Sequence, residues 1–464
     1  MQRTKRVLFV CTCSGLFHGA SIIVIFFSPL QLTMTSNTAQ RSEDPPTQKT
    51  HFVVALLTAG RVAPCFSPAV GFFMQRYHDL RSRHERRPLR LMYYRNGYRG
   101  LLQGERFDIT EEDIKTAPLL VAKAGSPIGG SRVRLSNLDH LMLRKLIASK
   151  QDDPYDTCAK QLVKDGVDIL HVVGSNNANQ TALQLVEICK HQYSHTIRAI
   201  GLPKTTENDM APVQQSLGAI TAAKEGAQYF FNIVPEHQAN PRMLIIHVIK
   251  GFSGWLCAAT AREYRKILNN EEFVQALGQG IDNYDLHGVY TPEMVLDFPS
   301  EVVRLRRCMD RLGNVNIFVS HGTSKDAIIA DAKRRGIEVP KHEILGYPII
   351  DAGKYFSDLL SKGLRAEKVL VQHSDIYVRA AAPCAEDIRL VQSCVSTAVD
   401  IALNEEGSSS GVVGHDVNYH GLLHLIPHSS MSGSRPFDIN TPWFVQLLGA
   451  IGQPVTHPKY LSKM

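Results

Sequence analysis

The 464-residue sequence lacks three features that would point to common classes of binding protein. Its nine cysteines form no zinc-ligand pattern, and Lys and Arg form no dense stripe beyond short runs such as residues 83–90. No internal repeat stands out. The net charge of +7 suits anionic ligands, but over this length it falls short of a nucleic-acid footprint, so we predict no nucleic-acid partner.

The cysteines that are present predict reduced thiols rather than a disulfide framework. Five of them sit among apolar neighbours at scattered spacings: Cys158, Cys189, Cys257, Cys308 and Cys394. Buried free thiols of this kind are typical of a cytosolic or organellar protein.

Negative charge is missing from the first part of the chain, where no acidic residue precedes Glu43. Residues 7–30 carry no formal charge and follow Arg3, Lys5 and Arg6. Three interpretations stay open: a signal anchor, a transit peptide, or an ordered protein that begins near Met34. Residues 35–50 read as a disordered linker. Membrane contact is predicted only through this N-terminal segment.

The rest of the chain alternates between strand and helix patterns. The composition, 44% hydrophobic and 20% charged, is long enough for two α/β domains. Apolar runs predict strands over residues 52–59, 90–94, 167–173, 196–202, 243–249, 314–320 and 368–373. Helices are predicted from Ser67, over 181–193, from Val213, and over 300–312, 325–335 and 385–403. This alternation indicates parallel sheets covered on both faces.

One polar stretch, residues 201–218, stands out between a strand and a helix. Lys204, Thr205, Glu207 and Asp209 lie within it, directly after Pro203. Open α/β sheets bind ligands at the carboxyl ends of their strands, so the stretch is a candidate site. On composition alone it is equally compatible with an ordinary polar loop.

The stretch resembles the Pro-Lys-Thr-Ile-Asp-Asn-Asp signature of the phosphofructokinases, in the Lys form typical of pyrophosphate-dependent members. The resemblance runs from about His51 to Gln453 and includes residues 54–65, 125–137, 239–260, 291–322, 387–394 and 436–454. It implies two Rossmann-like α/β domains with parallel sheets facing a central cleft. Residues 1–50 precede these domains as the N-terminal segment and linker. Residues 51–200, completed by part of 370–464, are expected to bind the phosphoryl donor, and residues 201–370 the sugar phosphate.

The resemblance also implies a role for particular residues and a magnesium cofactor. Glu207 stands where the family removes the proton of the sugar hydroxyl, with Lys204 beside it. Donor-binding residues would be Gly60, Arg61, Arg132, Gly174 and Asn177. Substrate-binding residues would be Thr205, Asp209, Arg242, Lys250, Gly251, Glu293 and Arg379. Asn176 occupies the position of the magnesium ligand.

Several of these positions depart from the family pattern. The family has Gly-Gly-Asp-Asp where this chain has Gly174-Ser-Asn176-Asn177, and Gly-Gly where it has Gly60-Arg61. Neutral amides are poor anchors for Mg²⁺, whereas added cations favour an anion bound without metal. Two hypotheses follow. The chain is either a pyrophosphate-dependent phosphofructokinase, or a catalytically degenerate relative that binds a sugar phosphate or another phosphate anion, or regulates a catalytic paralogue. A homo-oligomer such as a dimer, or a hetero-oligomer with that paralogue, is expected.

Overall fold

A computed structural model describes residues 51–81, 87–277, 280–342, 346–404 and 409–454. The described residues form one compact unit. The predicted N-terminal segment, with its linker, lies outside the described residues. Within the described ranges, no helix combines the length and apolar character needed to cross a membrane.

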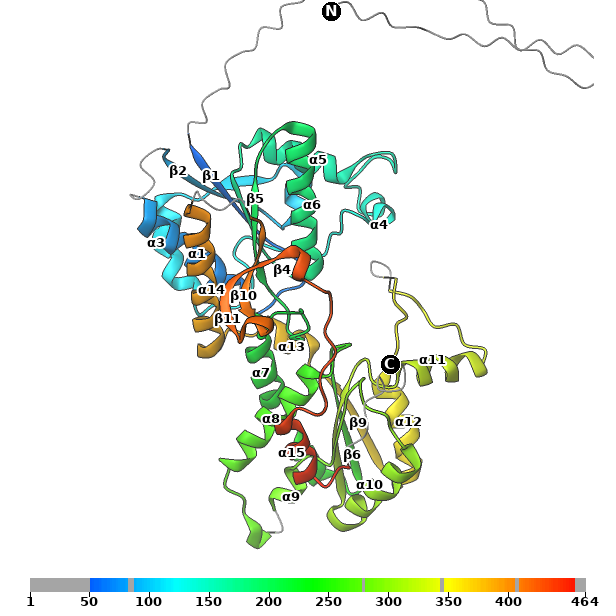
Figure 1. The fold of residues 1–464 in the computed structure, drawn as a ribbon. Helices are drawn as coiled ribbons and strands as arrows, with labels where there is room; N and C mark the ends of the chain where they lie inside the picture. The colour runs from blue at the N-terminus through cyan, green and yellow to red at the C-terminus, as the bar shows by residue number, and fades with distance from the viewer. Residues whose placement is uncertain (1–50, 82–86, 278–279, 343–345, 405–408, 455–464) are drawn as a thin grey trace, which may run out of the picture. The chain divides into compact units, whose positions relative to one another are not determined.

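The first half of the chain builds a seven-stranded sheet, which residues near the C-terminus complete (Figure 1). Its strand order is β11-β10-β5-β4-β1-β2-β3. The inner strands run parallel, whereas β3 and β11 pair antiparallel at the two edges. Its strands are β1 (Phe52–Thr58), β2 (Leu89–Tyr94), β3 (Arg106–Asp108), β4 (Ile169–Gly174), β5 (Arg198–Pro203), β10 (Gly411–Asp416) and β11 (Leu422–Pro427).

The middle of the chain forms a four-stranded, all-parallel sheet in the order β7-β8-β6-β9. These strands are β6 (Met243–Ile249), β7 (Gly288–Tyr290), β8 (Asn314–Ser320) and β9 (Lys368–His373). Every residue of β6 is buried, and its side chains alternate between two apolar clusters. Such alternation is required when helices cover both faces of a sheet.

Helices cover both faces of each sheet. On the large sheet, α1 (Phe66–Leu80), α3 (Glu111–Leu120) and α14 (Ala385–Leu403) pack on one face; α2 (Tyr98–Gln103), α5 (Pro154–Lys164) and α6 (Asn176–Tyr193) pack on the other. On the small sheet, α7 (Ala219–Phe231), α8 (Trp255–Asn269) and α15 (Pro442–Ala450) oppose α10 (Phe298–Leu312) and α12 (Ala352–Leu364). The shorter helices are α4 (Leu138–Leu143), α9 (Ile281–Tyr284), α11 (Lys325–Arg334) and α13 (Asp375–Ala380). The predicted α/β fold with parallel-rich sheets is confirmed.

Four predicted helix starts are wrong by one to six residues, among them α10, which begins at Phe298 rather than at residue 300. Helix α1 begins at Phe66, and Ser67 donates its hydroxyl to the Leu120 carbonyl at 2.8 Å instead of capping the helix. Helix α6 begins at Asn176, so both Asn residues lie in its first turn. Helix α7 begins at Ala219, because Val213 pairs with Asp416 instead.

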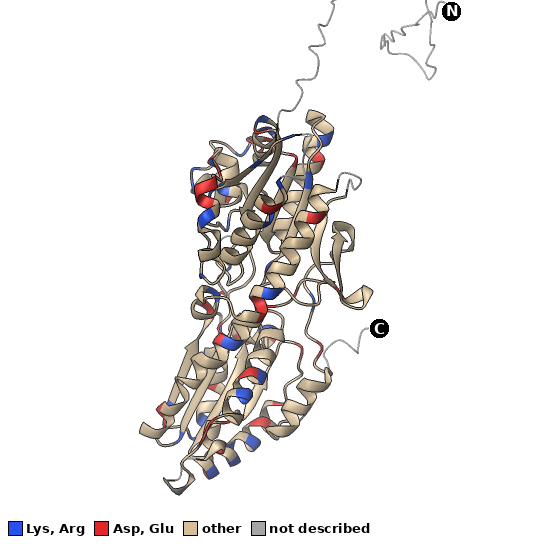
Figure 2. Cartoon of the chain, turned by 90° about the vertical axis from the view of Figure 1, so that its left-hand side faces the viewer, with Lys and Arg blue, Asp and Glu red and all other residues tan. Residues whose placement is uncertain are grey.

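All seven described cysteines are free thiols, and five of them are buried. Cys308 and Cys384 are half-buried, so the prediction of buried thiols holds for four of the five cysteines that it named. On the outer helices, basic and acidic residues are interspersed in the view of Figure 2.

Candidate active site

The carboxyl ends of strands from both sheets converge on one cluster of charged residues. Arg61 follows β1, Lys204 follows β5, Lys250 follows β6, and Asp375 stands two residues after β9. Arg61 Nη1 lies 2.9 Å from Asp375 Oδ2, and Lys250 Nζ lies 3.6 Å from the same oxygen. The strand-end location predicted for the site therefore brings residues from two sheets together.

The loop after β5 is held rigidly by its own side chains. Thr205 donates its hydroxyl to Asp209 Oδ1 at 3.0 Å and accepts the Glu207 N–H at 3.0 Å. Asn208 has a positive φ of 50°, and its Oδ1 accepts both the N–H and the hydroxyl of Ser216. These contacts fix the direction in which Glu207 projects.

Glu207 has the protonation behaviour of a general base. Burial raises its pKa to about 7, helped by the negative charge of Asp209 and opposed by Lys250. The Phe252 N–H donates to Glu207 Oε2 at 3.3 Å, which holds the carboxylate against the turn after β6. A base with a pKa near neutrality is well matched to removing a hydroxyl proton.

Lys204 is buried beside Glu207, with a side chain that is 7% exposed. Its ammonium group donates to the Arg61 carbonyl at 3.0 Å and lies 4.9 Å from the centre of the Phe66 ring. Burial lowers the pKa of Lys204 to about 8. A side chain at Gly60 would come within 3.0 Å of this ammonium group, which explains why a glycine with φ 97° precedes Arg61.

The turn after β1, where Gly60 and Arg61 are predicted to bind the donor, already uses one backbone N–H within the fold. The Gly60 N–H donates to the Ser131 carbonyl at 2.7 Å, so it is not free for a phosphate. The cationic groups on this side of the cluster are the side chains of Arg61 and Arg132. Arg132 Nη2 lies 3.0 Å from His342 Nε2, and burial together with the charge of Arg61 lowers the pKa of Arg132.

Asp375 is the carboxylate around which the cations gather. Besides Arg61 and Lys250, Arg379 donates from Nε to Asp375 Oδ1 at 3.0 Å, one helical turn along α13. Burial alone would raise the pKa of Asp375, yet the charges of Lys250, Arg379 and Arg61 lower it below its usual value. Asp375 was missed in the sequence. Its spacing of four residues from Arg379 was the one available signal.

Glu293 and Gly251 lie on the small-sheet side of the site. Glu293 Oε1 accepts the N–H groups of Gly254 and Phe437 at 3.0 and 2.9 Å. Its Oε2 is buried and accepts no hydrogen bond among the described residues, so its capacity to accept one is unused. The Gly251 carbonyl accepts the Gly322 N–H and the Ser320 hydroxyl, both at 2.9 Å.

The segment from Ser434 to Phe437 ties Asp209 to Glu293. Ser434 donates its hydroxyl to Asp209 Oδ2 at 2.8 Å, and the Arg435 N–H donates to the Asp209 carbonyl at 2.6 Å. Two residues later, Phe437 donates to Glu293, as described above. Only residues 436 and 437 of this segment belong to a stretch of the family resemblance, and no local pattern in the sequence indicated that the segment spans the site.

Arg242 is not brought to the cluster within this chain. It precedes β6, whereas Lys250 follows the same strand, so the two lie roughly 25 Å apart. Its guanidinium donates to Asp310, to the Arg365 carbonyl and to the Leu364 carbonyl at 2.9, 2.8 and 2.7 Å. Contact with a substrate at the cluster would require Arg242 from a second copy of the chain.

The start of α6 does not form a carboxylate metal site. Asn177 is exposed, and Asn176 Oδ1 is buried without a hydrogen-bond donor among the described residues. Gly174 allows close packing there, because a Cβ would lie 2.6 Å from Ala178 Cβ. Within the described ranges, no three His, Cys, Asp or Glu residues gather as a metal-binding group. One neutral oxygen therefore does not fit a Mg²⁺ ion anchored by protein carboxylates.

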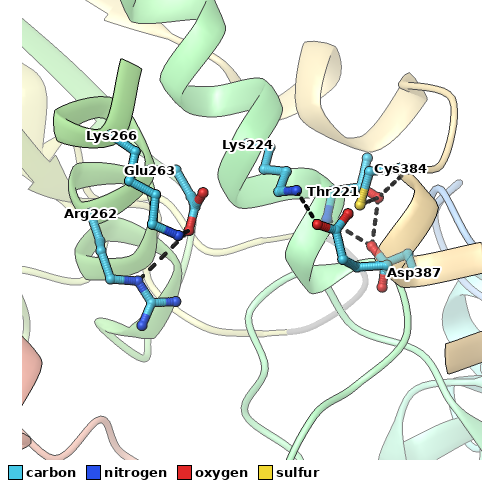
Figure 3. Close-up of polar contacts among 8 residues, drawn as sticks. Thr221, Lys224, Arg262, Glu263, Lys266, Cys384 and Asp387 are labelled. Atoms are coloured by element: carbon cyan, nitrogen blue, oxygen red, sulfur yellow. Dashed lines mark hydrogen bonds and ion pairs between the residues drawn. The ribbon is translucent and has the colours of Figure 1, made fainter. Parts of the chain in front are cut away.

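A buried carboxylate anchors the far end of the loop that carries Glu207. Asp387 accepts the N–H groups of Gly218 and Thr221 at 3.1 and 2.7 Å, and the Thr221 hydroxyl at 2.5 Å. Figure 3 shows this contact beside Cys384, whose N–H donates to the same hydroxyl. The first turn of α7 is thereby fixed to α14, which holds the returning end of the loop.

Two surface pockets of about 390 and 400 Å³ lie beside α7 rather than over the cluster. Both are lined by Gln215, Ile220 and Glu386, and the second also by Lys224 and Arg262. In Figure 3, the Lys224–Glu386 and Lys266–Glu263 ion pairs already use charges near the second pocket. Neither pocket is lined by Glu207, Lys204 or Asp375.

The chain is an α/β protein in which strand ends of two sheets converge on a charged cluster that contains a buried lysine and a carboxylate of raised pKa. The phosphofructokinase family matches residues 53–276. The chain is 46% identical over 405 residues to the pyrophosphate–fructose 6-phosphate 1-phosphotransferase of Methylotuvimicrobium alcaliphilum, covering 86% of this chain and 96% of that protein. It is 42% identical over 404 residues to that of Mastigamoeba balamuthi, with the same coverage. The chain belongs to the phosphofructokinase family.

A solved structure shows the same fold at lower identity. The pyrophosphate-dependent phosphofructokinase from Marinobacter aquaeolei matches with a TM-score of 0.62 and 16% identity, over 88% of this chain and 93% of that one. The chain is thus phosphofructokinase-like in sequence and fold, and the similarity to named phosphotransferases over most of its length does not favour the degenerate alternative.

Proposed function

We propose that this protein transfers a phosphoryl group from pyrophosphate to a hydroxyl of fructose 6-phosphate, giving the bisphosphate and inorganic phosphate. The observation that carries the proposal is the pairing on one loop of a carboxylate with a pKa near 7 and a buried ammonium group. The named activity of relatives that are 40–46% identical supports the same reaction.

The roles follow from charge and position. Glu207 removes the proton of the attacking hydroxyl, whose oxygen then bonds to phosphorus as the bond to the leaving phosphate breaks. Lys204 and the arginines stabilise the negative charge that spreads over the phosphoryl oxygens. Thr205 and Asp209 hold the loop. Glu293 Oε2 accepts a sugar hydroxyl, and Arg379 with Lys250 attracts the phosphate of the sugar.

Fixed cations neutralise the phosphate charge that a metal ion held by carboxylates would otherwise neutralise. Arg61, Arg132, Lys204, Lys250 and Arg379 act on one another or on Glu207 and Asp375 electrostatically. The magnesium that the family implies has only the neutral amide of Asn176 at its predicted position. The proposed mechanism therefore contains no step through a metal.

Pyrophosphate, rather than ATP, is the proposed donor. The Lys204 ammonium group fills the space against the Gly60 turn, where the rest of a nucleotide would otherwise extend. A second copy of the chain is proposed to supply Arg242, because this residue lies at the opposite end of β6 from the cluster.

A coupled assay tests the proposal directly. Purified protein is supplied with fructose 6-phosphate and either pyrophosphate or ATP, with and without Mg²⁺. Turnover with pyrophosphate supports the proposal. Turnover with ATP alone overturns the choice of donor, and no turnover with either donor overturns the reaction.

A further inference from the structure

The cations of the cluster are not vacant, because Asp375 already occupies the centre between three of them. Its Oδ2 accepts from Arg61 at 2.9 Å and lies 3.6 Å from Lys250 Nζ, while its Oδ1 accepts from Arg379 at 3.0 Å. Asp375 takes Nη1 of Arg61 and Nε of Arg379, so a phosphate that binds these atoms competes with the carboxylate for them.

The environment makes this competition strong. The side chains of Arg61, Asp375 and Lys250 are 31%, 27% and 30% exposed, and that of Arg379 is 16% exposed. Charges that are screened this little by water interact more strongly than surface ion pairs. One carboxylate offsets three nearby cations only in part, so a surplus of positive charge remains.

We propose that Asp375 is a resident counter-anion that a phosphate group displaces, and that it makes the cluster select doubly charged phosphate over singly charged anions. A singly charged anion that displaces the carboxylate replaces one negative charge with another, so the attraction to the cations does not increase. A phosphate dianion brings twice the charge and three oxygens, which can contact Arg61, Lys250 and Arg379 together. The inference rests on the proposed function only in taking this cluster as the phosphate site.

Removing the charge at constant shape tests the proposal. In Asp375→Asn, inorganic phosphate measured by calorimetry without Mg²⁺ should bind about tenfold more tightly, since a negative charge has left a partly buried site. The affinity for acetate should increase by a larger factor, so that the ratio of phosphate affinity to acetate affinity decreases. Asp400→Asn is the matched control, because Asp400 also pairs with an arginine, Arg76 at 2.6 Å, but on the surface of α14.

Weaker or unchanged phosphate binding in a folded Asp375→Asn variant would overturn the proposal and leave Asp375 as a structural clamp. If the variant folds poorly, Asp375→Ser gives the same comparison. The parent protein gives a third comparison. Phosphate should raise its melting temperature more than acetate does at equal ionic strength. Equal increases in melting temperature with phosphate and with acetate would also contradict the inference.

Kinetics separate this inference from the proposed reaction. In Asp375→Asn, KM for pyrophosphate and KM for fructose 6-phosphate should both fall while kcat changes less, because Arg61 is assigned to the donor and Lys250 with Arg379 to the sugar phosphate. A purely structural role would lower kcat. If the parent shows no turnover but phosphate binding tightens as expected, the reaction is wrong and the role of Asp375 stands. If turnover is found and binding does not tighten, the reverse holds.

Discussion

The two ends of strand β6 carry cations in opposite circumstances. At the amino end, Arg242 donates three hydrogen bonds, to one carboxylate and two carbonyls, at 2.7–2.9 Å. At the carboxyl end, Lys250 lies 3.6 Å from a single carboxylate that it shares with two arginines. Within this chain, Arg242 bonds to one carboxylate and two carbonyls, whereas Lys250 shares one carboxylate with two arginines. The excess of positive charge therefore lies at the carboxyl end of β6, which is where we propose the ligand site.

The largest expected effect at the carboxyl end comes from removing the base. Glu207→Gln keeps the shape of the side chain but cannot accept the hydroxyl proton, so kcat should fall about 10³-fold. Steady-state kinetics measures the loss. Glu112→Gln is the control, because Glu112 is an exposed carboxylate that pairs with Lys115 on α3. Activity within a few-fold of the parent would remove Glu207 from the mechanism.

The second largest loss is expected from Lys204→Met, which removes one positive charge from the cluster. The buried ammonium group stabilises developing phosphoryl charge, so kcat should fall about 10²-fold. Lys354→Met provides the comparison, because Lys354 pairs with Asp358 on the surface of α12. A change in KM alone would mean that Lys204 only binds the donor and does not act in the transition state.

A narrow pH optimum should distinguish this end of the strand from an ordinary ion-paired surface. Glu207 acts ionised, so kcat/KM should rise with pH through about 7. Lys204 acts protonated, so kcat/KM should fall again above about 8. In Lys204→Arg the alkaline limb should disappear, because a guanidinium stays charged. An alkaline limb that is unchanged in this variant would contradict the assignment.

The fold could be predicted in detail wherever local pattern determines structure. Strands β6, β8 and β9 and helix α14 have the predicted bounds, since each is an apolar run or stripe with abrupt polar ends. The predicted start of α7 was wrong because the apolar spacing from Val213 does not belong to a helix. Val213 packs with Val412 and Ile426 and pairs with Asp416, about two hundred positions away. No local pattern reveals such a partner.

The site could be predicted only in part, for the same reason. The signature stretch gave Glu207 and Lys204, but nothing local to Asp375 shows that Arg61, 314 residues earlier, meets it. Arg242 carried a readable signal: it precedes a strand whose carboxyl end faces the site. A resemblance transfers residue types, but it does not say which copy of the chain supplies them.

Arg379 and Arg242, the two arginines proposed to contact the sugar phosphate, give a further test of the comparison between the two ends of β6. Arg379→Ala should raise KM for fructose 6-phosphate about tenfold, because one charge-assisted contact is lost. Arg242→Ala should instead lower the free energy of unfolding by about 1 kcal/mol, because the hydrogen bonds to the Arg365 and Leu364 carbonyls are lost. Kinetics and denaturant titration of both variants check this. A rise in KM for Arg242→Ala in an oligomer would show that a neighbouring copy uses it.

The smallest expected effect comes from adding negative charge beside the cluster, at the start of α6. Asn176→Asp with Asn177→Asp places two carboxylates in the first helical turn, which favours the helix by about 0.3–1 kcal/mol each. Because Gly174 adjoins Lys204 through a backbone hydrogen bond of 2.9 Å, the same charges also reduce the positive surplus that attracts the donor. KM for pyrophosphate should therefore rise a few-fold at low Mg²⁺ and recover as Mg²⁺ is added, while the parent responds less to Mg²⁺. Thermal denaturation and a magnesium titration of both proteins separate the two effects. If the variant instead gains activity at every magnesium concentration, the neutral amides of Asn176 and Asn177 lower the activity of the parent, and the fixed cations do not compensate for the missing carboxylates.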